Sequence, residues 1–110
     1  MQISYNKEVG MAEMDIVNAI LRYLKSVPAC FVWKTHGGLY GTAGIPDIIA
    51  CIGGRFFAFE VKTVTGKLTK LQEATIRKIL VAGGTAVVLH SDDEVRVTLE
   101  ESGVALRNKH

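Results

Sequence analysis

The sequence lacks any apolar run approaching the roughly 18 residues that a membrane-spanning helix needs, so no membrane partner is expected. Its N-terminus has no basic segment followed by an apolar stretch and a small-residue cleavage site, which argues against secretion. Cysteine is scarce: Cys30 and Cys51 are the only two, and their spacing matches no metal site. Their apolar surroundings predict two buried free thiols, which suit a reducing cytoplasm.

The net charge is also small, at +2, and by itself implies no nucleic-acid partner. Its distribution is more informative, because local groups of basic side chains make the phosphate contacts in nucleic-acid complexes. One such group occupies the middle of the chain and consists of Lys34, His36, Lys62, Lys67 and Lys70. A second is the basic tail over residues 100–110, which includes Arg107, Lys109 and His110.

The 110 residues are too few for two hydrophobic cores, so we expect one domain over residues 1–110. Residues 11–95 form its expected core. Residues 1–10 are ambiguous and are compatible with a short strand, a disordered arm, or leader sequence ahead of Met11. A domain of this size is only modestly stable alone, which favours self-association.

Hydrophobic periodicity predicts alternating helices and strands. The expected helices cover residues 11–27 and 69–81, and the expected strands cover residues 31–33, 47–52, 55–62 and 85–90. Gly53-Gly54 would join two of these strands as a tight hairpin. After Ser91 the residues allow either a helix that begins with a capping box or an alternating strand. The order of elements predicts the α/β class, with a central mixed β-sheet flanked by α-helices.

The expected hairpin gathers charged side chains on one face. Because successive side chains of a strand alternate, Glu60 and Lys62 share a face, while the apolar side chains of Phe57, Phe59 and Val61 point to the opposite face. That apolar face is the one expected under the helices. Counting residues on both sides of the turn places Asp47 close to Glu60 and Lys62.

Two carboxylates and one ammonium group on a single patch suit phosphodiester hydrolysis. The carboxylate oxygens of Asp47 and Glu60 are ligands that Mg²⁺ prefers. The metal would polarise a phosphoryl oxygen and lower the pKa of a bound water. Lys62 could orient that water or offset the charge that grows on the phosphorus. The alternative is a plain surface salt bridge, which is common and contributes little stability.

Two polar residues interrupt the apolar faces of the expected helices. Glu13 lies in the apolar stripe of the first helix, where a carboxylate is costly unless it is paired or bound to a cation. The alternative is a glutamate that is favoured in a first turn by the helix dipole alone. Gln72 lies on the inward face of the second helix, but it also fits a capping box with Thr69.

The glycine-rich segment over residues 35–44 matches neither a P-loop nor a dinucleotide-binding motif. Its glycines predict a flexible loop that lets a substrate backbone approach closely. His36 could contact a phosphate or lie in solvent. Trp33 and Tyr40 could stack on an exposed base, although core packing is the preferred interpretation for Trp33.

Together these residues resemble a known pattern. Gly44-Ile-Pro-Asp47 followed by Glu60-Val-Lys62 is similar to the PD-(D/E)xK signature of many restriction and repair nucleases. More narrowly, an ordered series of motifs across residues 11–95 resembles the VRR-NUC family in its stand-alone, virus-type form. The series comprises Glu13-x-x-Ile16, Gly44-Ile-Pro-Asp-Ile-Ile49, Phe59-Glu-Val-Lys62, Gly66-Lys-Leu-Thr-Lys-Leu-Gln72 and Ala82-Gly-Gly84.

The resemblance implies a restriction-endonuclease-like core and a DNA endonuclease that depends on Mg²⁺ or Mn²⁺. Asp47 and Glu60 would be metal ligands together with the backbone carbonyl of Val61, and Glu13 is a further candidate ligand. Lys62 would be the catalytic lysine, and Gln72 the polar catalytic residue after the ExK strand. The expected substrate-binding side chains are those of Lys34, His36, Lys67 and Lys70.

The resemblance also implies a homodimer that cuts branched DNA such as Holliday junctions. The expected setting is DNA repair in the cytoplasm of a bacterial cell or of a virus-infected host, as for a phage enzyme. The alternative is a catalytically silent DNA-binding or assembly subunit. The intact set of Asp47, Glu60 and Lys62 argues against that alternative, because paired acids without a metal would repel phosphate.

Overall fold

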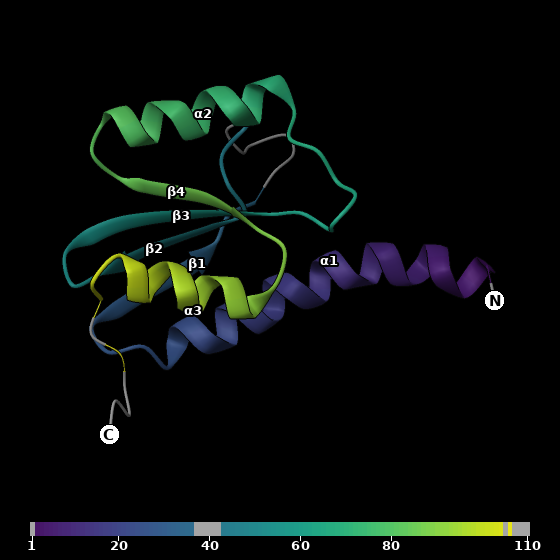
Figure 1. Cartoon of the computed structure of the whole chain (residues 1–110), viewed down its shortest axis with the longest axis horizontal. Coiled ribbons are helices and arrows are strands. Elements are labelled where there is room, and N and C mark those ends of the chain that lie inside the picture. The colour runs from purple at the N-terminus through teal and green to yellow at the C-terminus, as the bar shows by residue number, and fades with distance from the viewer. Residues whose placement is uncertain (1, 37–42, 105, 107–110) are drawn as a thin grey trace.

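The computed structural model describes residues 2–36, 43–104 and 106, with side chains described from Glu13 onward. The elements in chain order are α1 (Gln2–Lys25), β1 (Cys30–Lys34), β2 (Ile48–Ile52), β3 (Arg55–Val61), α2 (Lys70–Val81), β4 (Thr85–Leu89) and α3 (Asp92–Glu101). The predicted α/β class is confirmed, since a mixed sheet lies between α2 on one side and α1 and α3 on the other (Figure 1). The side chains of Tyr40, Arg107, Lys109 and His110 lie outside the described residues.

The four strands form one sheet in the order β1-β2-β3-β4. The first two pairs are antiparallel, and β3 pairs with β4 in parallel. A parallel pair needs a crossover connection, and α2 provides it. In this order β1 is an edge strand and has only one neighbouring strand, β2.

The predicted hairpin between β2 and β3 is confirmed. Gly53-Gly54 forms the turn, and both glycines have positive φ, 57° and 82°, as a two-residue hairpin requires. The register pairs Ile48 with Phe59. Asp47, one residue before β2, therefore lies beside Glu60, as counting from the turn predicted.

Helices cover both faces of the sheet, although to different extents. α1 and α3 bury the face that carries Phe57, Phe59 and Val61, the apolar face expected from the alternation of β3. On the opposite face, α2 packs Ile76 and Ile79 against a smaller apolar cluster. That cluster consists of Ile49, Ala58 and Ala86. The face with the charged side chains is therefore partly covered as well, which the sequence did not predict.

Helix α1 is longer than expected. The backbone is helical from Gln2, so the short strand, one of the interpretations left open for residues 1–10, is wrong. The segment contains no proline and one glycine, so little in it opposes a helix, and its first turns extend beyond the sheet (Figure 1). The helix ends at Lys25, ahead of Pro28. Neither α1 nor another described helix is long and apolar enough to cross a membrane.

The segment after Ser91 is a helix, so the alternating-strand interpretation is wrong. The Ser91 side chain caps α3 by accepting a hydrogen bond from the Glu94 backbone N–H. Val95 and Leu99 are buried, whereas Val97 between them is exposed. The four-residue spacing of the buried pair is the helical period, and this spacing determined which side chains enter the core.

Three side chains predicted to be buried are not. Cys51 and Trp33 are exposed and Cys30 is half-buried. Both thiols are free, as expected. Trp33 and Cys51 lie on β1 and β2, on the face that α2 packs against, but α2 leaves these two side chains uncovered. Apolar composition alone could not show that the covering helix stops short of this edge.

Candidate active site

Asp47 is held by two strands at once. The Thr35 backbone N–H donates to the Asp47 carbonyl (2.8 Å), and the Thr35 hydroxyl donates to the Pro46 carbonyl (2.8 Å). The Val61 backbone N–H donates to Oδ2 of Asp47 (2.8 Å). The backbone of Asp47 is thus fixed by the end of β1, and its carboxylate by β3. Sequence reasoning missed Thr35, because only the register of β1 against β2 brings it opposite Asp47.

Glu60 is the one buried charged residue among the described residues, with 3% of its surface exposed. Its Oε2 accepts a hydrogen bond from Nε2 of Gln72 (3.0 Å) and lies 3.7 Å from Nζ of Lys62. Its Oε1 is buried and has no hydrogen-bond partner among the described residues. An unpaired buried carboxylate oxygen is costly, so the site retains a feature that a cation would satisfy.

The surroundings of Glu60 favour its protonated form. Burial is the largest cause and, with the negative charge of Asp47, raises the pKa of Glu60 to about 7. The more weakly felt charge of Glu13 acts in the same direction, while Lys62 opposes both. Two carboxyl groups that share a buried site repel each other when both are ionised. A cation between them would remove that repulsion.

Gln72 both caps α2 and faces the sheet, the two interpretations that the sequence left open. Its Oε1 accepts from the Thr69 backbone N–H (2.9 Å), and the Gln72 backbone N–H donates to the Thr69 hydroxyl (3.1 Å), which completes the capping box. Its Nε2 donates to Glu60. The two ends of one amide therefore connect the start of α2 to the buried carboxylate, so the alternatives were never exclusive.

Lys62 and Glu13 approach the carboxylate pair from different elements. The Lys62 backbone N–H donates to the Leu89 carbonyl (3.0 Å), which fixes this residue between β3 and β4. Glu13 is half-buried on α1, and its charge is felt at Glu60. Its carboxylate makes no hydrogen bond or ion pair with another described residue, and its role as a ligand stays a prediction.

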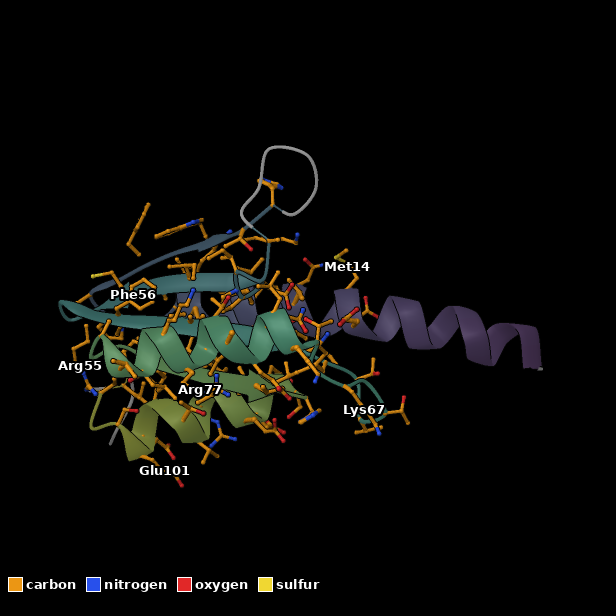
Figure 2. The ribbon with its side chains drawn as sticks, turned by 90° about the horizontal axis from the view of Figure 1, so that it is seen from above. Met14, Arg55, Phe56, Lys67, Arg77 and Glu101 are labelled. Carbon is orange, nitrogen blue, oxygen red and sulfur yellow. The ribbon has the colours of Figure 1, made fainter. Side chains whose placement is uncertain are left out.

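The four basic side chains expected to bind substrate all occupy exposed positions. Lys34 and His36 flank Thr35, which bonds to Asp47, and both are exposed. Lys67 and Lys70 are also exposed, on the β3–α2 connection and at the start of α2. Figure 2 shows Lys67 at the end of the molecule from which α1 projects, opposite to Arg55 and Glu101. Their substrate contacts stay predictions.

A divalent cation fits the donors that the fold brings together. Asp47 and Glu60 supply hard oxygen ligands, and the unpartnered Oε1 of Glu60 needs a positive partner. Within residues 13–36, 43–104 and 106, no three His, Cys, Asp or Glu side chains are grouped closely enough to hold a metal. The other ligands would be the predicted Val61 carbonyl, water and a substrate phosphate, since Mg²⁺ usually retains water and takes few protein carboxylates.

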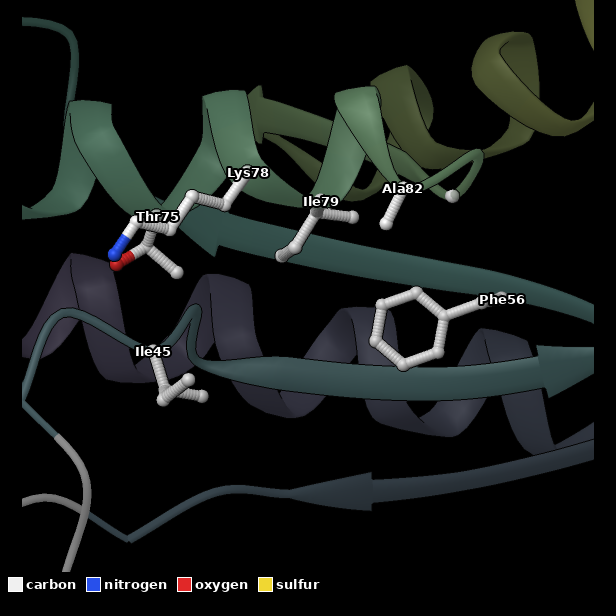
Figure 3. Close-up of a pocket in the computed structure, with 7 residues that line it drawn as sticks. Ile45, Phe56, Thr75, Lys78, Ile79 and Ala82 are labelled. Carbon is white, nitrogen blue, oxygen red and sulfur yellow. The ribbon is translucent and has the colours of Figure 1, made fainter.

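An apolar pocket of about 460 Å³ lies under α2, apart from these carboxylates. Figure 3 shows the Phe56 ring and Ile45 facing Thr75 and Ile79 of α2, and the C-cap residue Ala82, across it. Neither Asp47, Glu60 nor Lys62 lines it. Its walls suit an apolar group and would bind a phosphate poorly.

The segment that leads into Asp47 packs tightly against α2 at Gly44. This glycine has φ +85°, and a Cβ there would lie 2.7 Å from Cγ of Leu71 and 2.9 Å from Oγ1 of Thr75. We therefore expect Gly44→Ala to lower the free energy of unfolding by roughly 2–4 kcal/mol, from positive φ plus overpacking. Urea unfolding measures the loss.

The matched control for Gly44→Ala is Gly83→Ala. Gly83 has a similar φ of +96°, but a Cβ there would meet no atom within 4 Å. Gly83→Ala should therefore lower the free energy of unfolding only by the cost of positive φ, on the order of 1–2 kcal/mol. Equal losses at the two positions would show that the contact between Gly44 and α2 is not as close as described.

The fold and the site together define a class of protein: a mixed α/β domain with two carboxylates and a lysine at adjoining strand ends. Comparison with solved structures makes this specific, because the chain superposes on a VRR_NUC domain with a TM-score of 0.68 and 20% sequence identity. The match covers 81% of this chain and 95% of that one. The chain thus has the fold of a VRR_NUC domain, as its motifs predicted. No family model and no curated protein matches its sequence.

Proposed function

We propose that this chain is a divalent-metal-dependent DNA endonuclease. The observation that carries the proposal is the pairing of Asp47 with a buried Glu60 whose Oε1 has no partner, with Nζ of Lys62 at 3.7 Å from Oε2. Such a pair is unfavourable in a purely structural role and suits a site that holds Mg²⁺ or Mn²⁺. The likeness in fold to a VRR_NUC domain supports the same function.

Each residue has a distinct task in this proposal. A bound cation would polarise the scissile phosphate and lower the pKa of the attacking water. Asp47 arrives already oriented by the Val61 N–H, so it can bind the cation without reorganising. Gln72 donates to Oε2 of Glu60, and the unpartnered Oε1 would be available to hold the cation. Lys62 offsets the negative charge that develops on the phosphoryl oxygens.

We further propose branched DNA, such as a Holliday junction, as the substrate and a homodimer as the active form. A two-fold dimer would present two sites to opposing strands. The exposed basic residues Lys34, His36, Lys67 and Lys70 would bind the phosphate backbone around each site. These features rest on the family resemblance of the sequence motifs and on the exposure of these side chains.

The test compares cleavage of a labelled four-way junction with that of a matched linear duplex, in Mg²⁺, in Mn²⁺ and in EDTA. Paired cuts in the junction that need metal, with the duplex spared, would support the whole proposal. Metal-dependent cutting of all substrates alike would keep the nuclease and remove the junction preference. Folded protein that cuts nothing would instead favour a DNA-binding or assembly subunit.

The raised pKa of Glu60 predicts how the stability of the metal-free protein depends on pH. The folded pKa of about 7 lies above the ordinary value of 4.5, so the folded state binds this proton more tightly. The corresponding stability is fully present below about pH 4.5 and is lost as pH rises through about 7. Mg²⁺ binds the ionised form, so its stabilising effect should grow over the same range.

Thermal unfolding across this pH range, in EDTA and in excess Mg²⁺, measures both effects. We expect the melting temperature in EDTA to fall toward neutral pH more steeply than in Mg²⁺. If Mg²⁺ raises the melting temperature equally at acidic and neutral pH, metal binding does not depend on the ionisation of Glu60.

A further inference from the structure

Two aromatic side chains lie open to solvent on the edge strand β1. Phe31 is 69% exposed and Trp33 is 44% exposed. Their ring centroids are 5.4 Å apart and their planes are tilted by 44°. Large aromatic side chains usually bury most of their surface, so an exposed pair on one strand calls for a ligand or partner.

The pair lies on the same face of the sheet as the carboxylates. Trp33 pairs with Ile49 in the β1–β2 register, and the backbone bond from Thr35 to Asp47 continues that register by one step. Side chains two residues apart on a strand share a face, so Trp33, Ile49 and Asp47 all point the same way. Asp47 is therefore the diagonal cross-strand neighbour of Trp33, at a spacing of about 7–8 Å that an indole can span.

We propose that Phe31 and Trp33 form a stacking platform for an unpaired nucleobase of the DNA strand whose phosphate is bound at Asp47 and Glu60. This inference rests on the proposed nuclease function and specifies its substrate class: DNA with unstacked bases, as in single strands, flaps and junction arms. Bases in an intact duplex have their faces covered by neighbouring bases, so they cannot occupy this platform.

The charges around the platform match this occupant. Proteins that bind single strands combine aromatic side chains, on which bases stack, with basic side chains that follow the phosphates. Lys62 lies beside Glu60 on the face that carries Trp33 and Asp47, whereas Lys34 pairs with Ile48 and points to the opposite face. A strand can therefore place a base on the aromatic rings and a neighbouring phosphate near Lys62.

The first experiment uses Trp33 as its own reporter, because it is the only tryptophan in the chain. Its fluorescence is titrated in EDTA with an oligothymidine strand and with a hairpin duplex of equal phosphate number. Stacking on the indole should quench the emission with the single strand at least about twofold more than with the duplex. An abasic strand with the same phosphates should quench no more than the duplex. Equal responses to all three would overturn the proposal.

The second experiment removes the aromatic face while keeping an apolar side chain. Trp33→Leu should weaken binding of the single strand by roughly 5- to 100-fold, and Trp33→Phe should restore much of it. Neither change should alter binding of the abasic strand or the stabilisation by Mg²⁺. Phe56→Leu is the matched control, because Phe56 is also 44% exposed but lies near the hairpin turn, beside the apolar pocket.

These measurements separate the base platform from the proposed function, because binding in EDTA needs no catalysis. Selective binding of unpaired bases by a protein that cuts nothing would keep the platform and remove the nuclease. Metal-dependent cleavage with Trp33→Leu binding single strands as the unaltered protein does would keep the nuclease and remove the platform. If Trp33→Leu instead converts a dimer to a monomer with DNA affinity unchanged, the pair is a contact between two copies and the proposal is wrong.

Discussion

Asp47→Ala should reduce metal-dependent DNA cleavage by roughly 100- to 1,000-fold or more, the scale seen when one transition-state-stabilising group is lost. The carboxylate is a proposed metal ligand, and it is the acceptor for the Val61 N–H. Alanine removes both functions. DNA affinity should be unchanged or higher, because a negative charge near the phosphate is removed.

Asp47→Asn separates these two functions. The asparagine carbonyl can still accept the hydrogen bond from Val61, so local structure should be kept, but the negative charge that attracts the cation is lost. Both variants should therefore be inactive, with Asp47→Asn the more stable of the two. Asp15→Asn, on an exposed position of α1, is the control and should cleave as the unaltered protein does. Cleavage that survives in Asp47→Asn would remove Asp47 from the proposed mechanism.

The arrangement of Asp47, Glu60 and Lys62 was predictable because every step depended on local rules. A two-residue glycine turn fixes the register of a hairpin, and strand alternation then fixes the face of each side chain. Counting along two strands sufficed to place Asp47 beside Glu60. The backbone bond of Val61 to Asp47 follows from that register as well, although the sequence could not reveal that it would also orient the carboxylate.

The errors arose where burial depends on how far a helix extends over a sheet. The alternation of β1 is the same whether its outer face is covered or open, so Trp33 was assigned to the core. Cys51 was misassigned for the same reason. Coverage of this face is decided by where α2 lies, and α2 contacts β4 and leaves the β1 edge uncovered. Composition carries no information about that position.

Gln72 illustrates a different limit. From the sequence, the capping box and the inward-facing position of Gln72 are competing interpretations. They are compatible because its amide has a donor end and an acceptor end. The structure shows that the capping contact itself directs Nε2 at Glu60. The start of α2 and the buried carboxylate are thus coupled, so a change at Thr69 is transmitted to the site through Gln72.

The charge of Glu60 that the proposed metal binding needs is the same charge that destabilises the metal-free fold. In the metal-free protein it is buried, it adjoins Asp47, and its Oε1 is unpartnered. All three conditions penalise the ionised form. The ionised form of this carboxylate is therefore unfavourable in the folded protein. If Glu60 binds the proposed cation, the sign of a substitution here should differ between stability and activity.

Glu60→Gln should make the metal-free protein more stable at neutral to mildly alkaline pH, by roughly 1–3 kcal/mol from the displaced pKa. The amide is nearly the same size, and its oxygen can still accept the hydrogen bond from Gln72. The same substitution removes a proposed metal ligand, so the stabilisation by Mg²⁺ should disappear and cleavage should fall by roughly 100-fold or more. The fall in melting temperature toward neutral pH should disappear with it.

Glu101→Gln provides the control, since Glu101 is exposed on α3 at the opposite end of the molecule from Lys67 (Figure 2). It should change stability by no more than about 0.5 kcal/mol and leave the response to Mg²⁺ intact. Urea unfolding in EDTA, repeated in Mg²⁺, measures both variants. A Glu60→Gln protein that is less stable than the unaltered one in EDTA would mean that Glu60 serves the fold more than it serves a cation. Increased stability together with a lost Mg²⁺ response would instead identify Glu60 as a charge retained in the core for metal binding.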